Sequence, residues 1–324
     1  MEAYEPAPDA ELFYSLYDGV FRPQIVQVSL KLGIFTALAS GPLDAEVLAE
    51  SVGANAEGIR KLAGYLVAIG LLDKVQGGYG LTPCAETFLA RTSKAYAGDI
   101  VLGFTGPGLW DSVLRSVRSG EPAALLERFD QDAWVESYRT SRVVTSLEMW
   151  RAAGIAPKPQ AEVTILDLAC GCGVKSFCLA QAHSSVRVVC VDQPDVLVVA
   201  KDLAGRMGIA ERVTLVSGDP INVELGNGVY DVCLAGQITH YLTEEQNAGV
   251  FCRIREALRD TGTFIIDVPM TDGEPDESAA FLSLVLWANS RGTAHSYEVY
   301  QRLLQTSGFK RVVQIGERWI AAEK

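Results

Sequence analysis

Residues 163–173 constrain the fold more than any other part of the sequence. A buried strand is expected over residues 163–168, because apolar residues dominate this stretch. It leads into a turn with glycine at positions 171 and 173, and the pattern is helical from residue 174 to residue 183. Such a turn can form a nucleotide site, because its backbone can approach a ligand and the helix start presents unpaired N–H groups. The two glycines could also serve a tight turn alone, so the following strands decide between these interpretations.

Three further strands follow, and each is expected to lead to a polar residue: strand 186–191 to Asp192, strand 213–216 to Asp219, and strand 230–234 to His240. Ligands of open α/β sheets bind outside the carboxyl ends of the strands. The glycine turn, the two acids and the histidine should therefore converge on one crevice.

The turn favours a cationic nucleoside over a dinucleotide. Ser176 stands where a dinucleotide site would have glycine, and Asp167 precedes the turn. A carboxylate in this place would repel a pyrophosphate and attract a positive charge. S-adenosylmethionine carries such a charge next to its ribose. The sequence has no Gly-x-x-x-x-Gly-Lys-Ser/Thr run, so a phosphate-binding loop of that kind is not expected.

With these motifs, nearly the whole chain resembles the S-adenosylmethionine-dependent O-methyltransferases of plant caffeate type and their bacterial natural-product relatives. Residues 167–173 are similar to the family's Asp-x-Gly-x-Gly-x-Gly run, and residues 192–196 to its Asp-Leu-Pro-His-Val. Residues 217–220 are similar to its Gly-Gly-Asp-Met, and residues 238–244 to its Ile-x-His-Asp-Trp-Ser-Asp. The resemblance implies an α/β Rossmann-like methyltransferase domain, with a mostly parallel seven-stranded sheet and an antiparallel C-terminal hairpin. A mainly α winged-helix dimerisation domain would precede it.

The resemblance also implies the cofactor, S-adenosylmethionine, and its product, S-adenosylhomocysteine. In the family the acid matching Asp192 holds the ribose, the acid matching Asp219 lies by the adenine amine, and the histidine matching His240 is the general base. Asp267 falls where the family carries a glutamate beside that histidine. The expected cofactor-binding residues are Asp167, Ala169, Gly171, Gly173, Asp192, Gln193, Gly218, Asp219, Pro220 and Gln237.

Three departures from the family pattern keep other functions open. Ala169 replaces the first glycine of the turn. Tyr241 and Ala294 each occupy a position where the family has an acidic residue. The same fold and cofactor could therefore serve C- or N-methylation, or non-methylating chemistry such as a pericyclic or hydroxylation step. A more remote alternative is a winged-helix regulator. His240 could also be an ordinary residue ahead of the helix that begins near residue 243.

The acceptor is expected in a pocket with apolar and aromatic walls. Candidate lining residues are Phe104, Trp134, Met149, Trp150, Trp287 and His295. Their composition suggests a flat, apolar acceptor, aromatic or polyketide-like. Residues of this type are also common in ordinary hydrophobic cores, so a core role stays open for each.

The N-terminal part has the pattern of a winged helix. Helical periodicity covers residues 12–32, helices are expected at 44–51 and 56–69, and a hairpin over residues 71–82 should turn at Gly77-Gly78. A DNA-reading helix needs exposed basic and amide residues, which the second short helix mostly lacks. In the resembled family this module forms the dimer interface, so we expect a homodimer.

Two prolines at residues 157 and 159 mark the clearest linker. We expect a dimerisation domain over residues 1–100, connecting helices over residues 101–156 and a methyltransferase domain over residues 157–324.

Charge and composition exclude several classes of function. The net charge is −12, with 28 basic and 40 acidic residues, so the sequence lacks the basic excess of a nucleic-acid-binding protein. The apolar stretches are shorter than the about 18 residues that span a bilayer, and the acidic N-terminus does not resemble a signal peptide. Seven cysteines, an odd number, argue against a disulfide framework, and Cys170-x-Cys172 lacks zinc-site spacing. We therefore expect a cytoplasmic enzyme with no metal, no membrane contact and a small-molecule acceptor.

Overall fold

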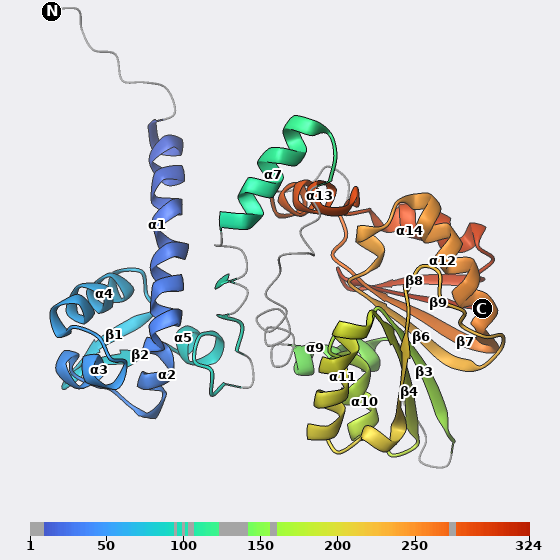
Figure 1. Cartoon of the computed structure of the whole chain (residues 1–324), viewed down its shortest axis with the longest axis horizontal. Helices are drawn as coiled ribbons and strands as arrows, with labels where there is room; N and C mark the ends of the chain where they lie inside the picture. Colours follow the sequence, from blue (N-terminus) through green and yellow to red (C-terminus); the bar gives the residue numbers. More distant parts are fainter. Residues whose placement is uncertain are drawn as a thin grey trace, which may run out of the picture. The chain divides into compact units, whose positions relative to one another are not determined.

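A computed structural model of the chain describes residues 10–93, 96–98, 101–102, 107–122, 142–155, 161–271 and 277–324 (Figure 1). The chain divides into two compact units, Met1–Pro107 and Gly108–Lys324. Each unit has its own hydrophobic core. In these described ranges, no helix is long and apolar enough to cross a lipid bilayer.

The first unit combines helices with a two-stranded hairpin. Its elements are α1 (Ala10–Leu32), α2 (Ile34–Ala37), the 3-10 helix η1 (Leu38–Ser40), α3 (Ala45–Ser51), α4 (Ala56–Ala68), β1 (Leu72–Val75), β2 (Gly78–Leu81) and α5 (Pro83–Phe88). Asp44 and Asn55 begin α3 and α4, because their side chains accept hydrogen bonds from N–H groups of the first turn. Phe35, Leu48 and Leu66 are among the residues of its core. The predicted helical N-terminal domain is confirmed.

The hairpin turns one residue earlier than predicted. Val75 pairs with Gly78, so Gln76 and Gly77 form the two-residue loop. Gly78 has a φ of 137°, and a side chain there would overlap the backbone of Leu43. Position 78 therefore needs glycine because another segment approaches closely, and not because the chain turns there.

The second unit is built around one mixed sheet. Its elements are α7 (Pro107–Ser119), α9 (Arg142–Ala152), β3 (Val163–Leu168), α10 (Val174–Ala182), β4 (Val186–Asp192), α11 (Pro194–Arg206), the 3-10 helix η2 (Ala210–Arg212), β5 (Val213–Ser217), β6 (Tyr230–Gly236), the 3-10 helix η3 (Thr239–Tyr241), α12 (Glu244–Ala257), β7 (Leu258–Asp267), α13 (Glu277–Ser290), α14 (Tyr297–Thr306), β8 (Arg311–Ile315) and β9 (Trp319–Glu323). The strand order is β5-β4-β3-β6-β7-β9-β8. Strands β3 to β7 pair in parallel, and β9 is antiparallel to both β7 and β8. The predicted seven-stranded sheet with an antiparallel terminal hairpin is confirmed.

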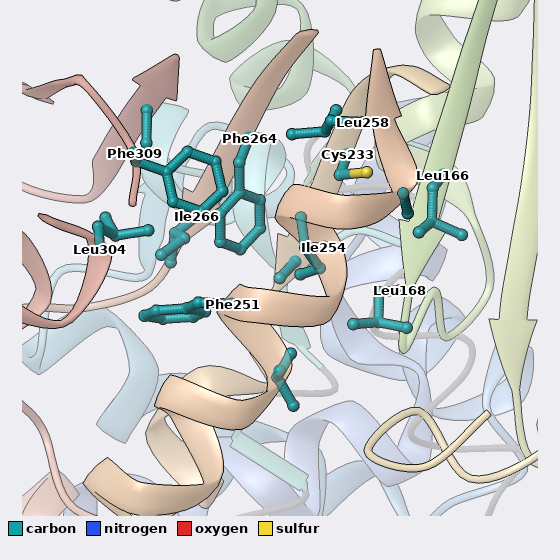
Figure 2. Close-up of a cluster of buried hydrophobic side chains, with 14 of the residues drawn as sticks. Leu166, Leu168, Cys233, Phe251, Ile254, Leu258, Phe264, Ile266, Leu304 and Phe309 are labelled. Atoms are coloured by element: carbon teal, nitrogen blue, oxygen red, sulfur yellow. The ribbon is translucent and has the colours of Figure 1, made fainter. Parts of the chain in front are cut away.

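Side chains of the central strands alternate between two cores, one on each face of the sheet. Ile165 belongs to the core under α10 and α11, whereas Leu166 and Leu168 belong to the core under α12 and α14. Figure 2 shows the second core, in which Phe264 lies between Phe251 and Phe309 at ring-centre distances of 5.4 and 5.7 Å. These two apolar layers fix the register of the strands, because a shift by one residue would exchange their faces.

The order of strands reverses direction between β3 and β6. After β3 the chain adds β4 and then β5 on one side, and it returns to add β6 and β7 on the other side. In open α/β sheets the ligand crevice lies at such a switch point, outside the carboxyl ends of the strands. The ends of β3, β4, β5, β6 and β7 are therefore where a functional site is expected.

Candidate cofactor and active site

The turn after β3 has the backbone that its glycines allow. Ala169, Gly171 and Gly173 have φ values of 55°, 58° and 76°, in the left-handed region. Gly173 is the residue from which α10 starts, and a Cβ there would lie 2.6 Å from Cε2 of Phe177. Glycine is required at 173 by both backbone conformation and space. Ala169 adopts the same conformation at a steric cost, which is a form of strain typical of functional turns.

Asp192 connects the end of β4 to the glycine turn. Its carboxylate accepts hydrogen bonds from the N–H groups of Gly171 and Gln193, both at 2.8 Å. Its carbonyl oxygen accepts the N–H of Gly218 at 3.1 Å, and this bond connects the end of β4 to the end of β5. Burial raises the pKa of Asp192, and these two N–H groups oppose the rise. The structure thus brings together the predicted residues at three strand ends.

Asp167 is a buried carboxyl group at the end of β3. Its side chain accepts the hydroxyl of Ser176 at 2.5 Å, and the residue is only 2% exposed. Burial raises the pKa of Asp167 to about 7. A cation placed beside this carboxyl would favour its ionised form. This agrees with the attraction of Asp167 for a cationic ligand that the sequence suggested.

Asp219 lies on the exposed side of the same edge. Its carboxylate accepts the N–H of Ile221 at 2.9 Å and the side-chain amide of Asn222 at 2.7 Å. The guanidinium of Arg253 donates to the carbonyl oxygens of Ile221 and Val223. These bonds hold the loop after β5, while Pro220 within it is buried.

His240 is buried in the short helix η3 that follows β6. The hydroxyls of Thr239 and Tyr300 lie 3.0 Å apart, and the Asn247 amide donates to the Thr239 carbonyl at 2.8 Å. The imidazole lies edge-on to the ring of Tyr241 at 4.6 Å. Thr239, Asn247 and Tyr300 were not predicted as site residues, because 61 residues separate Thr239 from Tyr300 and no local pattern connects them.

Asp267 ends β7 and lies beside Lys175 and Arg318 in the part of the chain that the structure describes. Oδ2 lies 2.5 Å from the ammonium of Lys175, and Oδ1 lies 3.6 Å from the guanidinium of Arg318. Its carbonyl oxygen accepts both the backbone N–H and the side-chain amide of Gln237, each at 2.9 Å. Lys175 was not predicted either. A signal was present, since it is the one charged residue in the sequence of α10.

The predicted acceptor-pocket residues occupy different environments. Met149 and Trp150 are buried in the core under α10, and the indole N–H of Trp150 donates to the carbonyl of Lys175 at 2.7 Å. His295 is buried with its ring edge-on to Tyr300, and burial lowers its pKa. Trp287 is 36% exposed on α13. Phe104 and Trp134 lie outside the described residues.

Comparison with models of protein families gives a match in each unit. An O-methyltransferase dimerisation domain matches residues 14–91, and a methyltransferase domain matches residues 165–262. Together they cover more than half of the chain. The chain belongs to the O-methyltransferases that carry this dimerisation domain. The family and enzyme class predicted for this methyltransferase from its motifs are confirmed.

Known relatives extend the likeness over nearly the whole methyltransferase. It is 24% identical over 315 residues to 3-hydroxy-5-methyl-1-naphthoate 3-O-methyltransferase of Streptomyces sahachiroi, covering 93% of this chain and 90% of the relative. It is 27% identical over 310 residues to phenazine-1-carboxylate N-methyltransferase of Pseudomonas aeruginosa, covering 92% and 91%. The solved structure of human N-acetylserotonin methyltransferase with S-adenosylmethionine has a TM-score of 0.78 at 21% identity, covering 100% of this chain and 99% of that chain. At that identity the structural likeness supports the fold.

Proposed function

We propose that this methyltransferase transfers the methyl group of S-adenosylmethionine to a hydroxyl group of an apolar, aromatic or polyketide-like small molecule. The observation that carries the proposal is the buried carboxyl group of Asp167 beside the glycine turn. A carboxyl with a pKa of about 7 gains its charge when a cation binds next to it. The relative from Streptomyces sahachiroi, named for a hydroxynaphthoate, supports a fused aromatic acceptor.

We assign the cofactor to the carboxyl ends of β3, β4 and β5. Asp192 would bind the ribose, because each of its oxygens accepts one backbone N–H and keeps a lone pair for a ribose hydroxyl. Asp219, whose side chain is exposed, would lie by the adenine amine. The other residues that we assign to this site are Asp167, Ala169, Gly171, Gly173, Gln193, Gly218, Pro220 and Gln237.

In the proposed mechanism, His240 accepts the proton of the acceptor hydroxyl. When bound, the cofactor would supply an electrophilic methyl group on a sulfonium, and its sulfur would leave as the neutral thioether of S-adenosylhomocysteine. Removing the proton makes the acceptor oxygen a stronger nucleophile, and a positioned base typically contributes about 10²–10⁴-fold to the rate. Alignment of the reacting atoms contributes about 7–11 kcal/mol in favourable cases. The bonds that fix η3 through Thr239 and Asn247 support this role, because a base must be held in place.

Release of S-adenosylhomocysteine from purified protein tests the proposal. The protein is incubated with S-adenosylmethionine and a panel of phenols, naphthols and hydroxynaphthoates, and the product is identified by mass spectrometry. Calorimetry without acceptor measures cofactor binding separately. We expect cofactor binding and turnover with at least one fused aromatic hydroxyl compound. A folded, ligand-free protein that gives no binding heat would refute the cofactor assignment.

N-methylation is a second candidate, favoured by the relative from Pseudomonas aeruginosa that is named for N-methylation of a phenazine. S-adenosylmethionine with a deuterated methyl group distinguishes the two reactions, because NMR of the product locates the label on oxygen or on nitrogen. Transfer to nitrogen alone would replace the hydroxyl acceptor in the proposal. Cofactor binding without consumption would favour the non-methylating alternative.

We further propose that the enzyme is a homodimer whose interface includes α1. That helix exposes Tyr14, Leu16, Val20, Phe21 and Val28, which lie on two sides of the helix, and so many exposed apolar side chains require a partner surface. Light scattering should give twice the chain mass of 34.9 kDa, and Leu16→Asp should shift it towards the monomer. A monomer at micromolar concentration in the unaltered protein would contradict this. We place the enzyme in the cytoplasm, where its seven free thiols would stay reduced; cell fractionation tests this.

A further inference from the structure

Lys175 is a buried cation directly after the glycine turn. It lies in the first turn of α10, one residue after Val174, and is 8% exposed. Its carbonyl oxygen is fixed by the indole of Trp150. Burying an ammonium group is costly unless an opposite charge compensates it. The position of the compensating acid therefore shows which elements the Lys175 side chain connects.

The side chain of Lys175 crosses the end of β6 to reach the end of β7. A Cβ on Gly236 would lie 2.5 Å from Nζ and 3.1 Å from Cδ of Lys175, so the missing side chain at position 236 leaves the path open. The ammonium then meets Oδ2 of Asp267 at 2.5 Å. Both side chains are about nine-tenths buried, with exposures of 10% and 8%. A side chain at position 236 would therefore displace the end of the Lys175 side chain from this path.

Asp267 also contacts the segment that leads to His240. Gly236 pairs with Asp267 in the sheet, and Gln237 binds the carbonyl of Asp267 through two hydrogen bonds. Gln237 has a φ of 65° and precedes His240 by three residues. Lys175, Asp267 and Gln237 therefore form a continuous set of contacts from the glycine turn to the segment that leads into η3.

Arg318 contributes less to this connection. Its guanidinium lies 3.6 Å from Asp267, and its side chain is 50% exposed, so water screens the interaction. The charge of Lys175 also acts on the other side of the turn, where it lowers the pKa of Asp167 against the larger effect of burial.

We propose that Lys175 and Asp267 are a pair of positioning residues, which fixes the cofactor turn relative to the base-carrying end of β6. Asp267 then acts on the active site through Lys175, and not as the direct acid partner of the His240 imidazole. The physical reason is that a carboxylate 2.5 Å from an ammonium forms a neutral unit, which has little effect on the proton affinity of a neighbouring imidazole. The proposal rests on the proposed function only for the role of His240 as base.

The titration of His240 tests this directly. The chain has three histidines, so labelling histidine with ¹³C at Cε1 gives three NMR signals, and His240→Asn assigns the one of interest. Asp267→Asn removes the carboxylate from the Lys175 ammonium and should lower the His240 midpoint, whereas Lys175→Met removes the ammonium from the Asp267 carboxylate and should raise it. In the double variant the shifts should cancel to within about 0.5 pH unit of the unaltered protein.

Two results would overturn the proposal. If the double variant shows the same fall as Asp267→Asn alone, of about one unit or more, Asp267 is the direct partner of His240. If neither single variant moves the midpoint while the protein stays folded, the pair has no influence on the base and is purely structural. The experiment needs neither acceptor nor turnover. Failure of methyl transfer would therefore refute the proposed function and leave this test intact.

The path across Gly236 gives a second test, independent of titration. Gly236→Ala should displace the Lys175 ammonium, lower the urea midpoint and weaken binding of S-adenosylmethionine about 10-fold or more. In a Lys175→Ala background the same change should add no further loss, because the obstructing side chain is gone. Gly205→Ala in α11 is the matched control, since no atom lies within 4 Å of its added Cβ. Equal losses from Gly236→Ala in both backgrounds would overturn the proposal.

Discussion

Gly173→Ala measures how much stability is lost when the glycine turn has to accommodate a side chain at position 173. At a φ of 76°, an alanine costs about 1–2 kcal/mol in backbone conformation. Its Cβ would also overlap the ring of Phe177, which is fully buried, and overpacking of this kind costs about 1–3 kcal/mol. We therefore expect Gly173→Ala to lower the free energy of unfolding of the second unit by about 2–5 kcal/mol.

The second unit can be observed separately, because all five tryptophans, at positions 110, 134, 150, 287 and 319, belong to it. Urea unfolding followed by tryptophan fluorescence therefore reports its stability alone. Gly208→Ala is the matched control: its φ is 68°, and nothing lies within 4 Å of an added Cβ. The control should lose only the conformational part, about 1–2 kcal/mol.

The difference between the two variants isolates the contact with Phe177. Combining Gly173→Ala with Phe177→Leu should reduce that difference, since leucine leaves room for the methyl group. If Gly173→Ala and Gly208→Ala destabilise the unit equally, the ring of Phe177 does not restrict the turn, and the steric part of the reasoning is refuted.

Three further predictions concern the proposed site. Asp192→Ala should weaken S-adenosylmethionine binding by about 1.5–3 kcal/mol in calorimetry, because charge-assisted hydrogen bonds are lost; unchanged affinity would move the ribose elsewhere. Affinity for S-adenosylmethionine should rise with pH up to about 7, by at most about 10-fold per unit, because the cation binds the ionised form of Asp167, whose pKa is raised to about 7. Asp167→Asn should flatten this profile, and an unchanged slope would assign it to another group. His240→Ala should reduce turnover about 10²–10⁴-fold with little effect on cofactor affinity, and full activity on the true acceptor would show that His240 is not the base.

The strand ends were predictable from sequence because they depend on local patterns. An apolar run sets each strand, and a glycine or an acid marks its end, as residues 163–173 and Asp192 illustrate. Since all parallel strands end at one edge, the convergence of the glycine turn, Asp192 and Gly218 follows from topology.

Contacts between distant side chains were not predictable in the same way. A lysine side chain is long enough to reach several neighbours, so its sequence position does not identify Asp267 as the partner of Lys175. Trp150 illustrates a different difficulty. It is buried in a core cluster, and the sequence leaves a pocket wall and a core role both open, because aromatic residues suit both environments. Gly78 was assigned to a turn, although the approach of Leu43 explains it.

The position of β9 in the sheet has a consequence for the order of folding. Strand β8 comes earlier in the chain but joins the sheet only through β9, which lies between β7 and β8. During synthesis, β7 therefore keeps an unpaired edge until residues 319–323 have left the ribosome, even though β3 to β7 are already available to pair. The finished hairpin completes the sheet, and until then the nascent chain exposes the edge of β7, to which chaperones or other nascent chains can bind.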